Sequence, residues 1–147
     1  MPDQSSNIEL ADQLSQRRAR MMPVLAMFFL FQQFSYFSHL PGDRTVDHVR
    51  IGAWVLMSTV LLAFLISGGA WSRSKTVRAL INDEVARANR AAAIQFGFLL
   101  AMAGAIVLYP FIDLLELNAR QVLHLIVSLG LAAAMLRFAM LERRALG

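Results

Sequence analysis

The chain has 147 residues, of which 57% are hydrophobic and 16% are charged, with a formal net charge of +4 and no cysteine. A soluble domain usually has about 25% charged and about 45–50% apolar residues, so this composition excludes a soluble globular enzyme and a disordered tail. The absence of cysteine excludes disulfides, thiolate catalysis and cysteine-ligated zinc or iron–sulfur clusters.

The hydrophobic residues are concentrated in four long runs, which predict four membrane-spanning helices. Residues 21–42, 51–72 and 91–112 are three runs of 22 residues without a charge, and a fourth run, 121–141, is interrupted only by Arg137. A helix of that length measures about 33 Å, enough to cross a hydrocarbon core of about 30 Å. The predicted fold class is an all-α membrane protein with a four-transmembrane-helix bundle.

Two regions are distinguished by their charge. Residues 1–20 form a charged amphipathic N-terminal segment, which we expect to lie in the cytoplasm, on the inner leaflet, as an interfacial helix. Residues 21–147 form the transmembrane domain. Its spans are predicted at about 21–40, 51–71, 91–112 and 120–141, with a cytoplasmic helical loop at 72–90.

The distribution of basic residues predicts that both termini lie in the cytoplasm. Lys and Arg near the ends of spans favour the cytoplasmic side of a membrane. The segments before span one, between spans two and three, and after span four share one side. They hold eleven basic and six acidic residues, a net charge of +5, against three basic and four acidic residues on the other side. We therefore predict a multi-pass protein of the bacterial cytoplasmic (inner) membrane.

Small residues recur every four positions along span three, at Ala93, Gly97, Ala101 and Ala105. Such a stripe lets two helix backbones approach closely in lipid. Span four contains a matching patch of small residues around Gly130. We expect spans three and four to pack through these faces as an antiparallel pair, and a homodimer contact through the same stripe is the alternative.

Two histidines offer an alternative function. His39 ends span one and His124 lies about one turn into span four, both toward the predicted outer face. Two imidazoles at similar depth can ligate a b-type haem, or bind a divalent metal together with carboxylates. The simpler interpretation is that both are interfacial histidines, and no cofactor is predicted. The alternative is a haem- or metal-binding electron-transfer protein.

Three other functions receive less support from the sequence. The spans contain no Asp or Glu, which proton-coupled export needs at membrane depth, so a small transporter subunit ranks third. No serine and histidine are accompanied by an acidic residue at matching depth, so we predict no enzymatic activity. No DNA- or RNA-binding motif is present, so direct contact with nucleic acid is not predicted.

The predicted cytoplasmic loop interleaves acidic and basic residues. Within residues 72–92, Ile81 and Val85 follow a helical spacing, which predicts an amphipathic helix that runs into span three. Asp83 and Arg87 are four residues apart in the order that favours a helical ion pair. One interpretation is a salt-bridged extension held at anionic lipid. The other is a docking surface for a soluble protein partner.

Residues 81–98, INDEVARANRAAAIQFGF, and residues 121–144, QVLHLIVSLGLAAAMLRFAMLERR, resemble small four-span bacterial inner-membrane proteins of the kind paired with helix-turn-helix regulators. In that group an Asn-Asp-Glu stretch precedes the third span and Leu-Glu-Arg-Arg follows the fourth. The resemblance covers roughly residues 72–147. It implies a non-enzymatic regulatory or assembly protein that docks a cytoplasmic partner, such as a transcription regulator. The implied docking positions are Asn82, Asp83, Glu84, Arg87 and Arg90.

Overall fold

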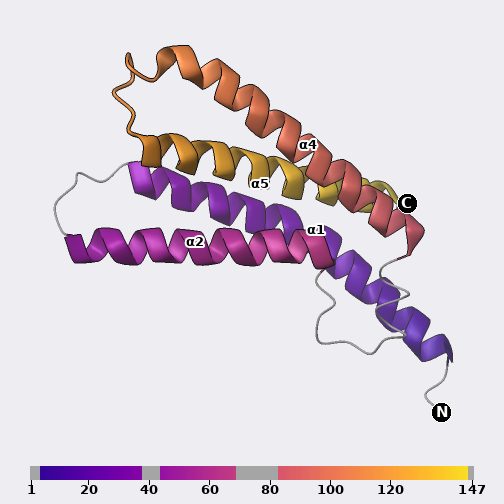
Figure 1. The fold of residues 1–147 in the computed structure, drawn as a ribbon. Coiled ribbons are helices and arrows are strands. Elements are labelled where there is room, and N and C mark those ends of the chain that lie inside the picture. The colour runs from indigo at the N-terminus through magenta and orange to yellow at the C-terminus, as the bar shows by residue number, and fades with distance from the viewer. Residues whose placement is uncertain (1–3, 38–43, 69–82, 146–147) are drawn as a thin grey trace.

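The computed structural model describes residues 4–37, 44–68 and 83–145, and the regular structure in these ranges is all helical. The described part of the chain contains four long helices, and a short 3-10 helix followed by turns connects the last two of them (Figure 1). The elements are α1 Gln4–Phe37, α2 Arg44–Ser67, α4 Glu84–Leu108, η1 Tyr109–Phe111 and α5 Ala119–Ala145.

Three of these helices, α2, α4 and α5, are long and apolar enough to cross a membrane. Over its whole length α1 is less hydrophobic than α2, α4 and α5, and its apolar half contains Pro23, Gln32 and Gln33. The amide oxygens of both glutamines are buried without a hydrogen-bond partner among the described residues. Among the described residues, α1 is not one of the three candidate spans.

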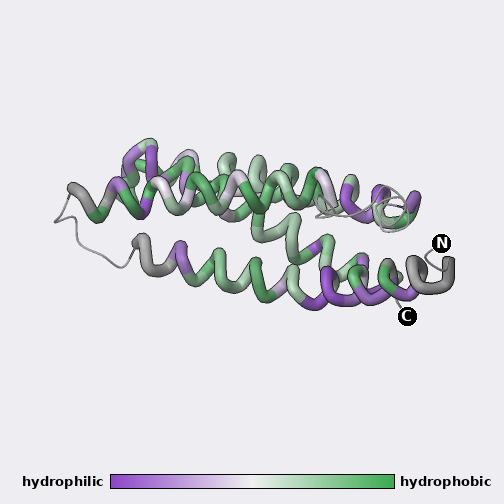
Figure 2. Tube along the Cα trace, turned by 90° about the horizontal axis from the view of Figure 1, so that it is seen from below, coloured by the Kyte–Doolittle hydropathy of each residue, from purple (hydrophilic) through white to green (hydrophobic). Residues whose placement is uncertain are grey.

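Consecutive helices run in opposite directions. α1 is antiparallel to α2, and α4 is antiparallel to α5 (Figure 1). The end of α2, the start of α4 and the end of α5 consequently lie at one end of the bundle, beside the first half of α1 (Figure 1). Many of the hydrophilic residues gather at this end (Figure 2). We call it the charged end.

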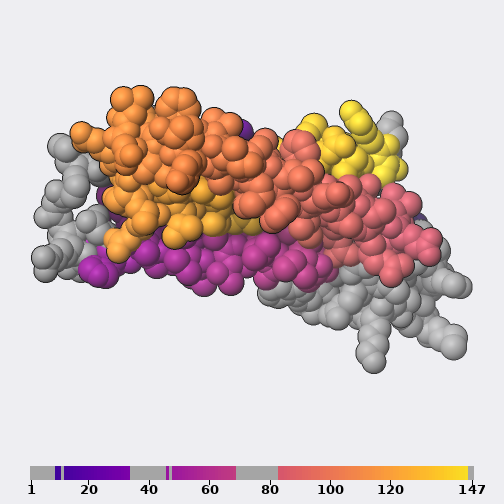
Figure 3. Space-filling model, turned by 45° about the horizontal axis from the view of Figure 1, so that its top comes forward, coloured from indigo at the N-terminus to yellow at the C-terminus, as the bar shows by residue number. Residues whose placement is uncertain are grey.

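Helix α5 occupies the centre of the bundle and contacts α1, α2 and α4. It is visible between α4 and α2 in Figure 3. The buried apolar residues of α5 recur every three or four positions and form a stripe along one face of the helix. The buried apolar residues of α1 form a similar stripe. Phe29, Phe138 and Met22, which lie on these stripes, are among the largest fully buried side chains and are at most 1% exposed. The shared core consists of Met22, Ala26, Phe29, Leu61, Leu65, Ala93, Leu131, Ala134, Met135, Phe138 and Ala139.

The N-terminal segment and the first apolar run form one continuous helix. Residues 4–20 form the first half of α1, which continues through Pro23 without a break. The residues before the proline contain no glycine and are rich in good helix formers such as Leu, Gln, Arg and Ala. Proline removes one helical hydrogen bond, but it does not end the helix here.

The start of α4 differs from the expected continuous helix across the loop. Asp83 has an extended backbone, with φ −61° and ψ 176°, and α4 begins at the next residue. The Asp83 carboxylate accepts a hydrogen bond of 2.7 Å from the Ala86 backbone N–H. An aspartate in this position satisfies one of the unpaired donors of the first helical turn and so fixes the helix start. Residues 72–82 of the predicted loop lie outside the described part of the chain.

Candidate functional site

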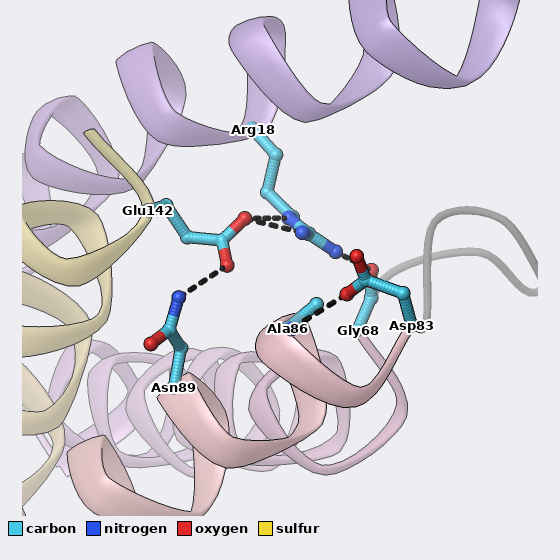
Figure 4. A network of polar contacts seen from close by, with 6 residues as sticks. All are labelled: Arg18, Gly68, Asp83, Ala86, Asn89 and Glu142. Atoms are coloured by element: carbon cyan, nitrogen blue, oxygen red, sulfur yellow. Dashed lines mark hydrogen bonds and ion pairs between the residues drawn. The ribbon is translucent and has the colours of Figure 1, made fainter. Parts of the chain in front are cut away.

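A buried ion pair joins α1 to α5 at the charged end of the bundle. Arg18 and Glu142 are only 7% and 5% exposed. The Nε of Arg18 donates to Glu142 Oε2 over 3.1 Å, and its Nη2 donates to the same oxygen (Figure 4). The Arg18 guanidinium also lies over the ring of Phe138, 5.2 Å from the centroid. A buried charge needs its partner, so this contact fixes α1 and α5 in register.

Glu142 extends this contact to a third helix. Its second oxygen, Oε1, accepts a hydrogen bond of 3.3 Å from Asn89 Nδ2, on α4 (Figure 4). Both carboxylate oxygens are therefore hydrogen-bonded, as a buried charge requires. One side chain of α5 thereby holds α1 and α4 together.

Two arginines cover the C-terminus of α2. Gly68 follows the helix with φ 73°, and its N–H bonds to Phe64 O at 2.8 Å. Arg18 Nη1 donates to Gly68 O at 3.4 Å, and Arg90 Nη1 donates to Ile66 O at 3.3 Å. The last carbonyls of a helix lack helical donors and carry partial negative charge, so cations stabilise them. α1 and α4 thus each supply a cap for α2.

The predicted docking residues separate into two groups in the structure. Glu84 and Arg87 are exposed in the first turns of α4, and Asp83 is the exposed N-cap. Arg90 is buried and points its guanidinium at the end of α2, so it belongs to the charged end of the core and not to an exposed docking surface. Asn82 lies outside the described residues.

The small-residue stripe of span three lies against α5. Ala93, Gly97 and Ala101 are buried, and Ala105 is half-buried. A Cβ on Gly97 would lie 2.5 Å from Gly130 O and 2.7 Å from Ala134 Cβ. The two backbones therefore meet at a distance that only glycine permits. In the single chain this stripe is occupied by α5.

His124 is packed against α2. Its ring stacks on Trp54 with centroids 4.3 Å apart and an interplanar angle of 23°. The Trp54 indole N–H donates to Ser128 Oγ at 3.3 Å, one turn further along α5. These contacts attach α2 to the centre of the bundle. His39, the other histidine of the haem or metal alternative, lies outside the described residues.

Sequence reasoning overlooked Glu142 and Arg18 as a pair, although a signal for both is present. Glu142 continues the apolar stripe of α5, following Phe138 at four-residue spacing, and Arg18 precedes Met22 in the same way on α1. A charge on the extension of a core stripe points toward the neighbouring helix. Since the two helices are antiparallel, the two extensions meet.

Arg18, Asn89 and Arg90 donate to carbonyls and to a carboxylate of the protein itself, so these three side chains hold the helices in place. Within ranges 4–37, 44–68 and 83–145, no group of three or more His, Cys, Asp or Glu side chains could hold a metal ion. No family model, curated protein or solved structure matches the chain.

Proposed function

We propose that this chain is a non-enzymatic regulatory or assembly protein of the bacterial cytoplasmic membrane. It spans the membrane four times, with both termini in the cytoplasm. It docks a cytoplasmic protein through the first turns of α4 and the loop before them. The main support is the first turn of α4, which is exposed and carries charges of both signs. The following turn is held in the bundle by hydrogen bonds to α5 and α2.

The topology rests on helix direction and charge together. The apolar half of α1, residues 21–37, has 17 residues, the lower end of the range for a membrane-spanning helix, and α1 runs antiparallel to α2 (Figure 1). If α1 crosses the membrane as a fourth span, the first half of α1, the start of α4 and the end of α5 all lie on the same side of the membrane. These segments belong to the parts of the chain with a net charge of +5, which the positive-inside rule assigns to the cytoplasm.

The docking surface rests on what α4 exposes and what it anchors. Glu84, Val85 and Arg87 are exposed, and Val85 retains 54% of its accessible surface. Asn89 and Arg90, in the next turn, are bound to α5 and α2. Charges and an apolar residue on a preorganised helix end can select a partner by complementarity at low cost in conformational entropy.

The test is a charge reversal confined to exposed residues. The variant Glu84→Lys/Arg87→Glu leaves the Asp83 cap and the buried contacts of Arg90 in place. Its control is Asp113→Lys/Arg120→Glu, a matched reversal at the opposite end of α4 and α5, where both residues are exposed. Each tagged protein is extracted from native membranes in mild detergent, and the co-purifying proteins are identified by mass spectrometry.

We expect one soluble protein, such as a transcription regulator, to be lost from the α4 variant and kept by the control at equal membrane levels. Retention of the same soluble protein by the α4 variant would show that docking at this surface is wrong. Recovery of membrane subunits alone would favour an assembly role without a cytoplasmic partner.

A further inference from the structure

Four exposed arginines lie where the end of α5 meets α1. Arg17 and Arg20 are on α1, and Arg143 and Arg144 are on α5. The Nε of Arg143 donates to the backbone oxygen of Ala19 at 3.4 Å, which places the last turns of α5 directly against this part of α1. We call these four residues the arginine cluster.

Among the described residues, no carboxylate forms an ion pair with the cluster. The ion pair found within 4 Å among the described residues is Arg18–Glu142, and no member of the cluster belongs to it. Asp12 lies five residues before the first of these arginines. Asp83 and Glu84, on α4, form no ion pair with them. The cluster therefore presents an unneutralised positive charge that attracts an anion.

An exposed apolar surface adjoins the cluster on both helices. Met21 and Val24 on α1 are 45% and 60% exposed, and Met140 on α5 is 48% exposed. Met140 precedes Arg144 by four residues, and Met21 follows Arg17 by four, so each lies one turn closer to the middle of the bundle. On two neighbouring helices the surface thus changes from guanidinium to apolar over one turn.

We propose that the arginine cluster binds the phosphate headgroup of an anionic phospholipid whose acyl chains lie along Met21, Val24 and Met140. Guanidinium groups match phosphate oxygens in a bidentate geometry. The exposed apolar surface beside the cluster favours a lipid over free phosphate, because acyl chains can cover that surface and a soluble anion cannot. This inference depends on membrane insertion and is independent of the docking of a protein at α4.

The experiment measures lipid selectivity directly. The full chain is reconstituted in phosphatidylcholine vesicles that contain trace spin-labelled phosphatidylglycerol or phosphatidylcholine, and the motionally restricted fraction is determined by electron paramagnetic resonance. We expect phosphatidylglycerol to be preferred about fivefold or more, since a basic residue near an anionic headgroup contributes about a factor of five. The preference should weaken as salt is raised.

Two double variants locate the site. Arg17→Gln/Arg20→Gln and Arg143→Gln/Arg144→Gln should each lower the preference at least about fivefold. Glutamine at position 143 keeps a donor for Ala19. The control Arg50→Gln/Arg120→Gln removes the same charge at the other end of the bundle and should leave the preference unchanged.

Three outcomes would overturn the proposal. The first is equal restriction of the two lipids by the unmodified protein, a result that does not depend on any variant folding. The second is an equal loss of preference in the control, which would mean that net charge alone acts. The third is binding of inorganic phosphate in phosphatidylcholine vesicles without any preference for phosphatidylglycerol, which would identify a soluble anion as the ligand.

Discussion

Arg143 donates its Nε hydrogen to the carbonyl oxygen of Ala19, the acceptor that Pro23 leaves without a helical donor. In an α-helix this carbonyl accepts from the residue four positions later, and proline has no N–H to give. Ala19 is buried, so an unpaired carbonyl there would cost about 1–3 kcal/mol. α5 therefore supports α1 at the position where proline weakens it.

This relationship predicts an interaction between two substitutions. We expect Pro23→Ala to raise the free energy of unfolding by up to about 3 kcal/mol, because it restores the helical bond. Arg143→Met should lower it by about 1–3 kcal/mol in the original chain and by less in the Pro23→Ala background. Unfolding in mixed detergent micelles, followed by circular dichroism, gives the four values. Equal effects of Arg143→Met in both backgrounds would contradict the assignment.

The Arg18–Glu142 pair predicts a large and asymmetric loss of stability. Glu142→Gln leaves the buried Arg18 without its counter-charge, and we expect a loss of about 3–5 kcal/mol in the free energy of unfolding. The double variant Arg18→Met/Glu142→Leu should lose much less, because no uncompensated charge remains.

The control for the ion pair is Glu9→Gln, since Glu9 is an exposed carboxylate of α1. We expect it to change the free energy of unfolding by no more than about 0.5 kcal/mol. The same detergent unfolding assay measures all three variants. A loss for Glu142→Gln as small as that of the control would show that the ion pair does not hold α1 and α5 together.

The close approach of α4 and α5 predicts opposite effects at two glycines. Gly97→Ala places a Cβ 2.5 Å from the backbone oxygen of Gly130, which cannot move aside like a side chain. We expect it to lower the free energy of unfolding by about 1–3 kcal/mol. Gly52→Ala, on α2, meets nothing within 4 Å and should raise stability by about 0.5–1 kcal/mol. A neutral Gly97→Ala would mean that the helices are further apart.

The arrangement of the helices follows from features that the sequence displays openly. Apolar runs of span length predict helices, and the structure has three that are long and apolar enough to cross a membrane. The spacing of Ala93, Gly97 and Ala101 indicates which face of α4 tolerates a close neighbour. These properties are local and periodic, so a single sequence reveals them.

The charged end is harder to predict because it depends on how helices distant in sequence align. Arg90 is one of several basic residues in the loop region, and only its burial against Ile66 shows that it is not exposed for docking. The start of α4 is a different case, since Asp83 followed by Glu84 is a helix N-terminus signal. The helical spacing of Ile81 and Val85 predicts a helix that begins earlier, and it conflicts with the N-terminus signal at Asp83.

The proposed topology predicts alternating exposure along the chain. The chain contains no cysteine, so single cysteines can be introduced without a background. Exposed positions are available near the ends of the predicted spans, at Gln13 in α1, Val46 in α2, Glu84 in α4 and Asp113 between α4 and α5. Each variant is treated with a membrane-impermeant maleimide, before and after permeabilisation of the inner membrane.

With both termini in the cytoplasm, Val46→Cys and Asp113→Cys should react before permeabilisation, whereas Gln13→Cys and Glu84→Cys should react only after it. The critical comparison is between Gln13 and Val46, because the apolar half of α1 lies between them and α1 is the helix with the lowest apolar content. Reaction of both on the same side would show that α1 does not cross the membrane, leaving three spans. In that case the N-terminal half of α1 would lie on the side opposite the start of α4 and the end of α5, and the Arg18–Glu142 ion pair could not form.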